Sequence, residues 1–134
     1  MKVRCIRELP TPEQAAALAP FYAPDRNQVF AVELGREYTV YCVYFGPGMP
    51  FLGIRDDYDQ LYPTPMCLFE VTDPALPAQW VARTDGNGSL SLEPPSFTPY
   101  YFSDLGDEDP DTVADFRRVR AAFEGPPASD VAEA

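Results

Sequence analysis

Short runs of hydrophobic residues are spread along the chain, and this pattern favours β-strands over long helices. Residues 37–45 (EYTVYCVYF) have the highest β propensity, because β-branched and aromatic side chains dominate this run. Similar but shorter runs predict strands at residues 2–9, 28–34, 51–54, 66–71, 79–83 and 89–92, an extended proline-containing segment at 62–65 and an aromatic segment at 97–102. Gly35-Arg36 is a candidate tight turn, and Asp85-Gly86-Asn87-Gly88 predicts a hairpin between two of the strands.

The first helix signal follows the N-terminal strand. Thr11 is placed to cap a helix that begins at Pro12, and Gln14 occupies the position of a capping-box partner. The Ala-rich run continues to Ala19, and Pro20 then stops the helix. We therefore expect one short helix here.

The second helix signal lies near the C-terminus and is stronger. Asp109 can cap the helix, Pro110 suits the first helical position, and Gly125 followed by two prolines ends it. An apolar stripe recurs at helical spacing, formed by Val113, Phe116, Val119 or Arg120, and Phe123. We expect this stripe to pack against a sheet.

These elements together predict an α+β fold that is mainly β. The expected architecture is a curved antiparallel sheet or small open barrel of about five to seven short strands, with a helix near each terminus. A chain of 134 residues fits one compact domain. We assign residues 1–125 to this domain and 126–134 to a flexible C-terminal tail.

The charge balance changes the functional picture. Ten basic and 21 acidic residues give a net charge of −11. Such a chain repels nucleic-acid phosphates and anionic lipids, so we expect no nucleic-acid or membrane partner. It is attracted to basic protein surfaces, although acidity that serves only solubility is an alternative.

Catalytic and metal-binding side chains are scarce. The chain has no histidine, which excludes the Ser-His and Cys-His types of nucleophilic catalysis and the common Cys/His zinc sites. Cys5, Cys42 and Cys67 are widely spaced, and we expect free thiols in a reducing cytosol. No signal-peptide core or run of 18 apolar residues is present, so we predict a cytoplasmic protein that is not an enzyme and has no cofactor.

Two acidic clusters are candidate sites. Asp56, Asp57 and Asp59 could share a hard cation, or they could belong to a solvated loop. The second cluster runs from Asp104 to Asp111, but its register does not fit a calcium-binding loop. It is either an acid-rich helix entrance or a docking patch for a cationic partner, and Asp115 would extend that patch.

The middle of the chain resembles a family of small uncharacterised bacterial proteins. The resemblance covers residues 34–80 and rests on the segments LGREYTVY (34–41), IRDD (54–57), YP (62–63) and LFEV (68–71), followed by Asp73, Leu76-Pro77 and Trp80. The family implies no established activity or catalytic residues. By analogy, small families of this kind resemble immunity proteins, which bind and neutralise toxins delivered between bacteria.

We therefore predict an acidic, immunity-type protein that binds a basic toxin or effector domain. The residues expected to contact the partner are Asp56, Asp57, Tyr58, Asp59, Asp104, Asp107, Glu108, Asp109 and Asp115. The chain would be a monomer or a homodimer. The alternatives are an adaptor homodimer that uses an exposed strand edge, and a small hydrolase that uses carboxylates such as Glu33, Glu37, Glu70 and Asp73.

Overall fold

The computed structural model describes residues 1–18, 30–46 and 48–125. In chain order its elements are β1 (Lys2–Cys5), α1 (Pro12–Leu18), β2 (Glu37–Phe45), β3 (Phe51–Arg55), β4 (Leu61–Pro65), the 3₁₀ turn η1 (Met66–Leu68), β5 (Phe69–Asp73), β6 (Val81–Thr84), β7 (Leu90–Glu93), α2 (Tyr101–Gly106) and α3 (Pro110–Glu124). All strand pairs are antiparallel, and the seven strands form one open sheet. The predicted fold class is confirmed.

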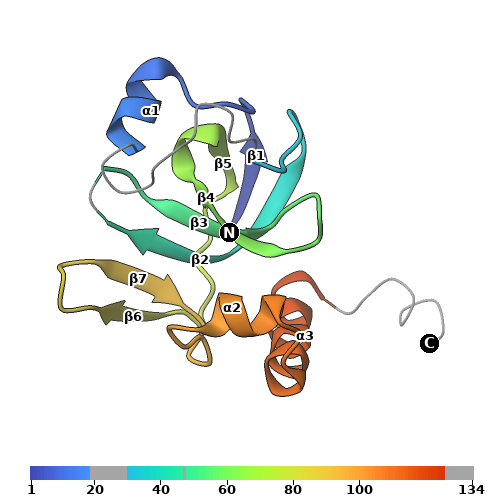
Figure 1. The fold of residues 1–134 in the computed structure, drawn as a ribbon. Coiled ribbons are helices and arrows are strands. Elements are labelled where there is room, and N and C mark those ends of the chain that lie inside the picture. The colour runs from blue at the N-terminus through green and yellow to red at the C-terminus, as the bar shows by residue number, and fades with distance from the viewer. Residues whose placement is uncertain (19–29, 47, 126–134) are drawn as a thin grey trace.

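Strand β2 is the centre of this sheet. One of its edges pairs with β3, which in turn pairs with β4. Its other edge is shared, because β1 pairs with the first part of β2 (Val3 opposite Tyr38) and β7 pairs with the last part (Tyr44 opposite Ser91). Strand β5 extends the sheet beyond β1, and β6 extends it beyond β7, so two lobes diverge from β2 (Figure 1).

A bulge allows β2 to contribute to two hydrophobic cores. The register with β3 shifts between Val40 and Cys42, which leaves Tyr41 as an extra residue. An extra residue inverts the in–out alternation of a strand. Tyr38 and Val40 therefore pack in the first core, whereas Tyr41 and Cys42 pack in the second.

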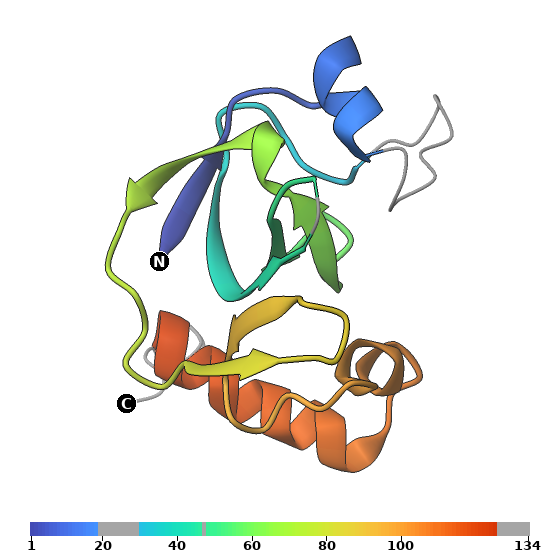
Figure 2. The same ribbon diagram turned by 90° about the vertical axis from the view of Figure 1, so that its left-hand side faces the viewer.

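The first core lies between the strands and the coil that precedes β2. Its buried members are Val3, Cys5, Phe30, Val32, Tyr38, Val40, Val43, Leu52, Ile54, Leu68 and Phe69. The second core lies between the other face of the sheet and helices α2 and α3, which lie on the opposite side of the molecule from α1 (Figure 2). Its buried members are Tyr41, Cys42, Leu61, Phe97, Tyr101, Phe116 and Val119.

Some predicted elements differ in the structure. The strand predicted at 28–34 is wrong over residues 30–34, which form no strand, and residues 28 and 29 lie outside the described part. Phe30 and Val32 are buried there in a coil segment, in which the Ala31 carbonyl oxygen accepts a hydrogen bond from the Asp57 amide of the loop between β3 and β4. The strand predicted at 2–9 ends at Cys5, and the one predicted at 66–71 begins with η1.

The N-terminal caps predicted for the two helices are confirmed. The Thr11 amide donates to Gln14 Oε1 (2.8 Å) and the Gln14 amide donates to Thr11 Oγ1 (3.3 Å), which is the expected capping box. The Thr112 amide donates to Asp109 Oδ2 (3.1 Å) at the start of α3. Ala19 and Pro20 lie outside the described residues, and helix α2 was not predicted at all. Of the helices that the structure describes, none has the length and apolar character needed to cross a membrane.

Candidate functional site

Ion pairs determine where the excess negative charge remains available. Seven basic side chains of the described chain contact carboxylates, in the pairs Lys2–Glu37, Arg4–Glu70, Arg36–Asp57, Arg55–Asp59, Arg83–Glu93, Arg118–Asp115 and Arg120–Glu124. No ion pair within residues 30–46 and 48–125 involves the five carboxylates where α2 leads into α3. We call this group the acidic corner; it comprises Asp104, Asp107, Glu108, Asp109 and Asp111.

The sequence-predicted residue Asp115 does not extend the acidic corner as a free charge. Its carboxylate accepts hydrogen bonds from the Tyr101 hydroxyl (2.8 Å) and from the Arg118 guanidinium (3.3 Å). Burial by itself raises the pKa of Asp115, but hydrogen bonds from Ser96, Tyr101 and Arg118 outweigh this effect and lower it. Asp115 thus joins α2 to α3.

The predicted aspartates of the β3–β4 loop are also used locally. Asp56 is buried and accepts hydrogen bonds from the amides of Tyr58 (2.9 Å) and Gln60 (3.1 Å), which shapes the loop. Asp57 accepts from the Arg36 guanidinium (2.7 Å) and the Tyr38 hydroxyl (2.8 Å).

The outer part of the same loop is more open to a partner. Asp59 forms an ion pair with Arg55, and its own side chain stays largely exposed. Tyr58 lies next to it in sequence and is 78% exposed. Of the four predicted loop residues, Asp59 and Tyr58 are therefore the two that a partner could reach most easily.

A small polar pocket opens beside this loop, at the C-terminal end of α3. Its volume is about 120 Å³. We call it the acidic pocket; it is lined by Arg36, Glu37, Tyr38, Thr39, Tyr41, Arg55, Asp56, Asp59 and Glu124. Four carboxylates and two guanidinium groups line this pocket, and three of the carboxylates form ion pairs, Glu37 with Lys2, Asp59 with Arg55, and Glu124 with both Arg55 and Arg120.

Tyr41 is one of the residues that line the acidic pocket, and its hydroxyl is an unusual buried group. Its ring is buried against Phe116 and Phe123, and its hydroxyl is buried without a hydrogen-bond partner in the described structure. Burial, and then the carboxylate of Glu124, raise the pKa of Tyr41 above its ordinary value, but the two groups do not meet the geometry of a hydrogen bond. Buried polar atoms without partners are rare in folded proteins.

The acidic pocket and the acidic corner lie at opposite ends of one helix. Helix α3 has 15 residues, a length of about 22 Å at 1.5 Å per residue. Asp109 caps its first turn, and Glu124 at its last turn forms an ion pair with Arg55 (3.7 Å). The predicted contact residues therefore form two separate groups.

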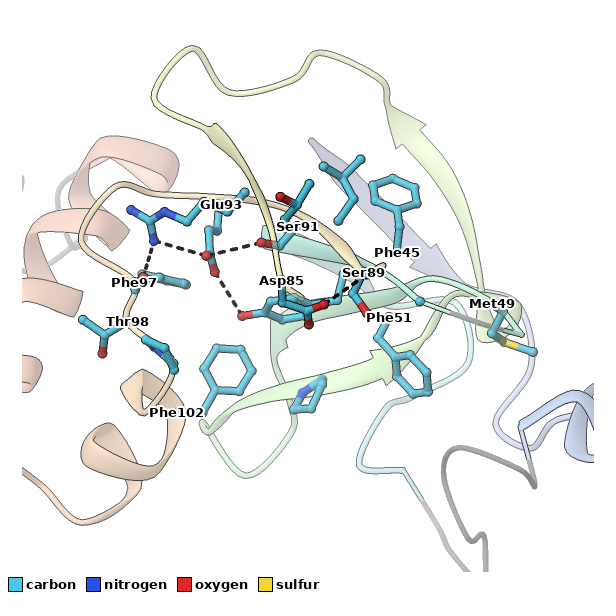
Figure 3. Close-up of a pocket in the computed structure, with 17 residues that line it drawn as sticks. Phe45, Met49, Phe51, Asp85, Ser89, Ser91, Glu93, Phe97, Thr98 and Phe102 are labelled. Atoms are coloured by element: carbon cyan, nitrogen blue, oxygen red, sulfur yellow. Dashed lines mark hydrogen bonds and ion pairs between the residues drawn. The ribbon is translucent and has the colours of Figure 1, made fainter. Parts of the chain in front are cut away.

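A larger cleft lies at the other end of β2 and was not predicted from the sequence. Its volume is about 590 Å³. Its walls come from the β2–β3 hairpin, the β6–β7 hairpin and the segment that leads into α2, with Phe45, Met49 and Phe51 at one end and Phe97 and Phe102 at the other (Figure 3). We call it the aromatic cleft. Segments distant in sequence form it, so the aromatic run at 97–102 is the one part of the cleft that the sequence indicates.

The floor of the aromatic cleft is polar. Glu93 is buried there and accepts hydrogen bonds from Arg83 (3.2 Å), Ser91 (3.4 Å) and the Tyr44 hydroxyl (3.4 Å). Arg83 also donates to the carbonyl oxygen of Pro95 (2.6 Å), which fastens the β6–β7 hairpin to the following loop. The network connects the end of β2 to the β6–β7 hairpin and to the loop that follows it.

Two kinds of chemistry can be examined among the described residues, metal binding and thiol reactivity. Within residues 1–18, 30–46 and 48–125, no group of three or more Cys, Asp or Glu side chains is arranged to hold a metal ion. Cys42 is buried behind the aromatic cleft, and burial raises the pKa of its thiol to about 12. A thiol with so high a pKa is a poor nucleophile near neutral pH.

Comparison with known proteins adds no identity. No protein-family model, no curated protein and no solved structure matches the chain. The family resemblance over residues 34–80 therefore stays a prediction, and the function must be argued from the acidic pocket, the acidic corner and the aromatic cleft.

Proposed function

We propose that this chain is an acidic protein-binding module that docks on a basic surface of another protein. The observation that carries the proposal is the position of helix α2. This helix contributes Phe102 to the wall of the aromatic cleft and, two residues later, Asp104 to the acidic corner. Side chains two residues apart in a helix point to nearly opposite sides, so a partner that inserts an apolar side chain into the cleft must also extend around α2 to contact these carboxylates.

The acidic corner supplies attraction to a basic surface. Its five carboxylates have no basic partner among the residues described, and four of them, all except Asp104, are exposed. Complementary charge accelerates encounter and selects the partner, and its effect weakens as salt screens the charges. Association is therefore expected to depend strongly on ionic strength.

The aromatic cleft supplies an anchor. Its volume of about 590 Å³ falls within the range of preformed binding sites, roughly 300–1,000 Å³. Buried apolar anchors in such hollows contribute most of the binding energy in many interfaces. A standard interface covers roughly 800 Å² on each partner, which is enough to include both the cleft and the acidic corner.

The immunity-type role is one specific form of this proposal. A basic toxin domain would be the partner, and the module would block it by covering its functional surface. Blocking of this kind requires contact but no catalysis. Protection of cells that express the toxin would support this form.

The proposal is tested by comparing two variants that lose equal charge. Asp107→Asn/Glu108→Gln changes the acidic corner, whereas Glu13→Gln/Glu33→Gln changes exposed residues elsewhere. A partner is first captured from host lysate by crosslinking at low salt, identified by mass spectrometry and purified. We expect its Kd to rise about tenfold or more between 50 and 300 mM salt, as for charge-steered complexes.

The variants then locate the interaction. The acidic-corner variant should bind the purified partner several-fold more weakly, and the control variant should bind like the wild type. Phe45→Ala, at the partly exposed rim of the aromatic cleft, should also weaken binding. Equal affinities for all variants, or the absence of a saturable partner at low salt, would refute the proposal.

A homodimer is a second candidate, favoured by the exposed edge of β6. All four β6 residues are exposed, and among the described strands β6 pairs only with β7. An unpaired edge can accept a strand from a second copy. Light scattering during size exclusion distinguishes the two candidates, because a concentration-independent monomer argues against the dimer.

A further inference from the structure

We infer that the outer edge of β6 is the place where the protein partner adds an extended segment as a further strand of the sheet. This inference rests on the proposed function, because the segment belongs to the basic protein that docks on the module. It assigns that segment a conformation, a β-strand, and a position beside the aromatic cleft, which Arg83 and Thr84 of β6 help to line. Three observations support it: the outward backbone groups of β6, the composition of this edge and the charge of the chain.

The hydrogen-bonding register of the β6–β7 hairpin shows which backbone groups of β6 point outward. The Asp85 amide donates to the carbonyl oxygen of Ser89 (3.2 Å), so these two residues form a hydrogen-bonded pair. In an antiparallel ladder such pairs alternate with pairs that are not hydrogen-bonded. Ala82 and Thr84 occupy the alternate positions of β6, and their amides and carbonyl oxygens therefore point away from β7.

These outward groups have no partner in the part of the chain that the structure describes. Within residues 1–18, 30–46 and 48–125, no hydrogen bond uses the amide or the carbonyl oxygen of Ala82 or Thr84. Strand β6 lies beyond β7 at the margin of the sheet (Figure 1), and all four of its residues are exposed. A row of alternating amides and carbonyl oxygens is paired most completely by another strand. The edge itself therefore specifies an extended polypeptide as its ligand.

The composition of β6 leaves this edge less protected than the other two edges of the sheet. Strand β4 contains Pro63 and Pro65, which have no amide to pair, and β5 carries two acidic side chains. Prolines and charges are common means by which proteins prevent pairing at a sheet edge. Strand β6 has no proline, and its single charged side chain, Arg83, forms an ion pair with Glu93 (3.2 Å) inside the same hairpin.

The charge of the chain favours a basic partner strand over a second copy of this chain. Each copy carries a net charge of −11, and the repulsion between two such charges opposes self-association. The same charge attracts a segment rich in lysine or arginine. Because Glu93 neutralises Arg83, no unpaired cation of β6 repels such a segment.

The test uses a short peptide of alternating valine and lysine with blocked ends as the probe. The same peptide with N-methylated central residues is the matched control, since it keeps the charge but cannot donate backbone hydrogen bonds. Binding is followed by NMR titration and amide hydrogen exchange of the full chain. We expect the probe to slow exchange of the Ala82 and Thr84 amides about tenfold or more, with little change at Arg83, whose amide already faces β7. The N-methylated peptide should bind about tenfold more weakly or worse.

A proline variant provides a second readout. Ala82→Pro removes an outward amide without removing a hydrogen bond to β7, so the hairpin should still form. It should weaken binding of the probe about tenfold, whereas Ala82→Val keeps the amide and should bind like the wild type. The exchange measurement uses the wild type, so it stands even if Ala82→Pro fails to fold.

Four results would overturn the inference. They are equal binding of the two peptides, no saturable shifts at millimolar probe, slow exchange of the Ala82 and Thr84 amides in the free monomer, and unchanged affinity in a folded Ala82→Pro variant. Protection that grows with protein concentration in the absence of the probe would also overturn it, because a second copy would then occupy the edge.

The inference and the proposed function can fail separately. If the purified partner binds the wild type and folded Ala82→Pro equally well, strand addition at β6 is wrong and the docking function stands. If the probe protects Ala82 and Thr84 as expected but no basic protein partner is found at low salt, β6 is confirmed as a strand acceptor and the docking function is wrong.

Discussion

The indole Nε1 of Trp80 donates a hydrogen bond to the backbone carbonyl oxygen of Tyr41 at a distance of 2.8 Å. Along this edge of β2 the pairing with β1 ends at Thr39, and the pairing with β7 begins at Val43. The Tyr41 carbonyl lies in the interval between the two strands, and the indole supplies the donor that neither strand provides. Trp80 also packs against the first core, so it holds both lobes to β2.

Trp80→Phe should destabilise the fold by about 1–3 kcal/mol, because it leaves a carbonyl group without its donor. Chemical unfolding followed by far-UV circular dichroism measures the change, since Trp80 is the sole tryptophan and its fluorescence is lost with it. Leu76→Ala, in the same connection but exposed, is the matched control and should shift stability by less than about 0.5 kcal/mol. Equal stability of Trp80→Phe and wild type would show that the hydrogen bond is dispensable.

Gly53→Ala should be strongly destabilising, because β3 passes too close to Cys42 for a side chain. A Cβ at Gly53 would lie 2.2 Å from Cys42 Sγ and 3.3 Å from Phe102 Cζ. Overpacking of this kind typically costs about 1–3 kcal/mol. Gly86→Ala, where a Cβ would meet no atom within 4 Å, should be close to neutral, and thermal unfolding compares the two variants. A Tm for Gly53→Ala equal to that of Gly86→Ala would contradict the packing described for β2 and β3.

Asp115 should make acid unfolding steeper. Its pKa is lowered in the folded chain from an ordinary value of 3.8, so its stabilising contribution is complete above about pH 4 and is lost as the pH falls through the lower folded pKa. Asp115→Asn should therefore flatten the dependence of unfolding free energy on pH below about 4. Urea unfolding at pH 6 and pH 3 measures this slope, and Asp107→Asn, on the exposed acidic corner, is the control. Parallel slopes for Asp115→Asn and wild type would count against the role of Asp115 in joining α2 to α3.

The three thiols should react in an order set by burial. Cys5 and Cys42 are buried, Cys67 is half-buried, and burial raises the pKa of each thiol, for Cys42 to about 12. Because only the thiolate is reactive, iodoacetamide at pH 7.5 should modify Cys67 first and slowly. Cys5 and Cys42 should react only after unfolding, as read by peptide mass spectrometry. Rapid labelling of Cys42 in the native chain would mean that the second core opens readily.

Features that depend on a few neighbouring residues were predictable. The strand expected at 37–45 coincides with β2, the Asp85 side chain accepts hydrogen bonds from the Asn87 and Ser89 amides in the expected hairpin turn, and Gly125 at φ 81° ends α3. Each follows from a local cause: β propensity, an Asp-centred turn, or a backbone angle that glycine tolerates. These causes act within one turn or strand, so they can be recognised without a fold.

Features that depend on distant partners were not predictable. Residues 30–34 have the apolar content of a strand and form none, and α2 arises from an aromatic segment whose Phe97 and Tyr101 rings stack in the second core at 4.1 Å between centroids. The bulge at Tyr41 is equally hidden, because an extra residue has meaning only relative to the strand beside it.

The sequence by itself determined the class of this protein: a mainly antiparallel β chain with capped helices, a surplus of carboxylates and no imidazole. Only the tertiary structure decided which of those carboxylates remain available. Asp57 and Asp115 form ion pairs with Arg36 and Arg118, whereas the acidic corner has no basic partner among the described residues. The acidic pocket forms where the β3–β4 loop meets the end of α3. The physical reason is that charge is a property of each residue, whereas pairing, burial and the shape of a cleft depend on which segments the chain brings together.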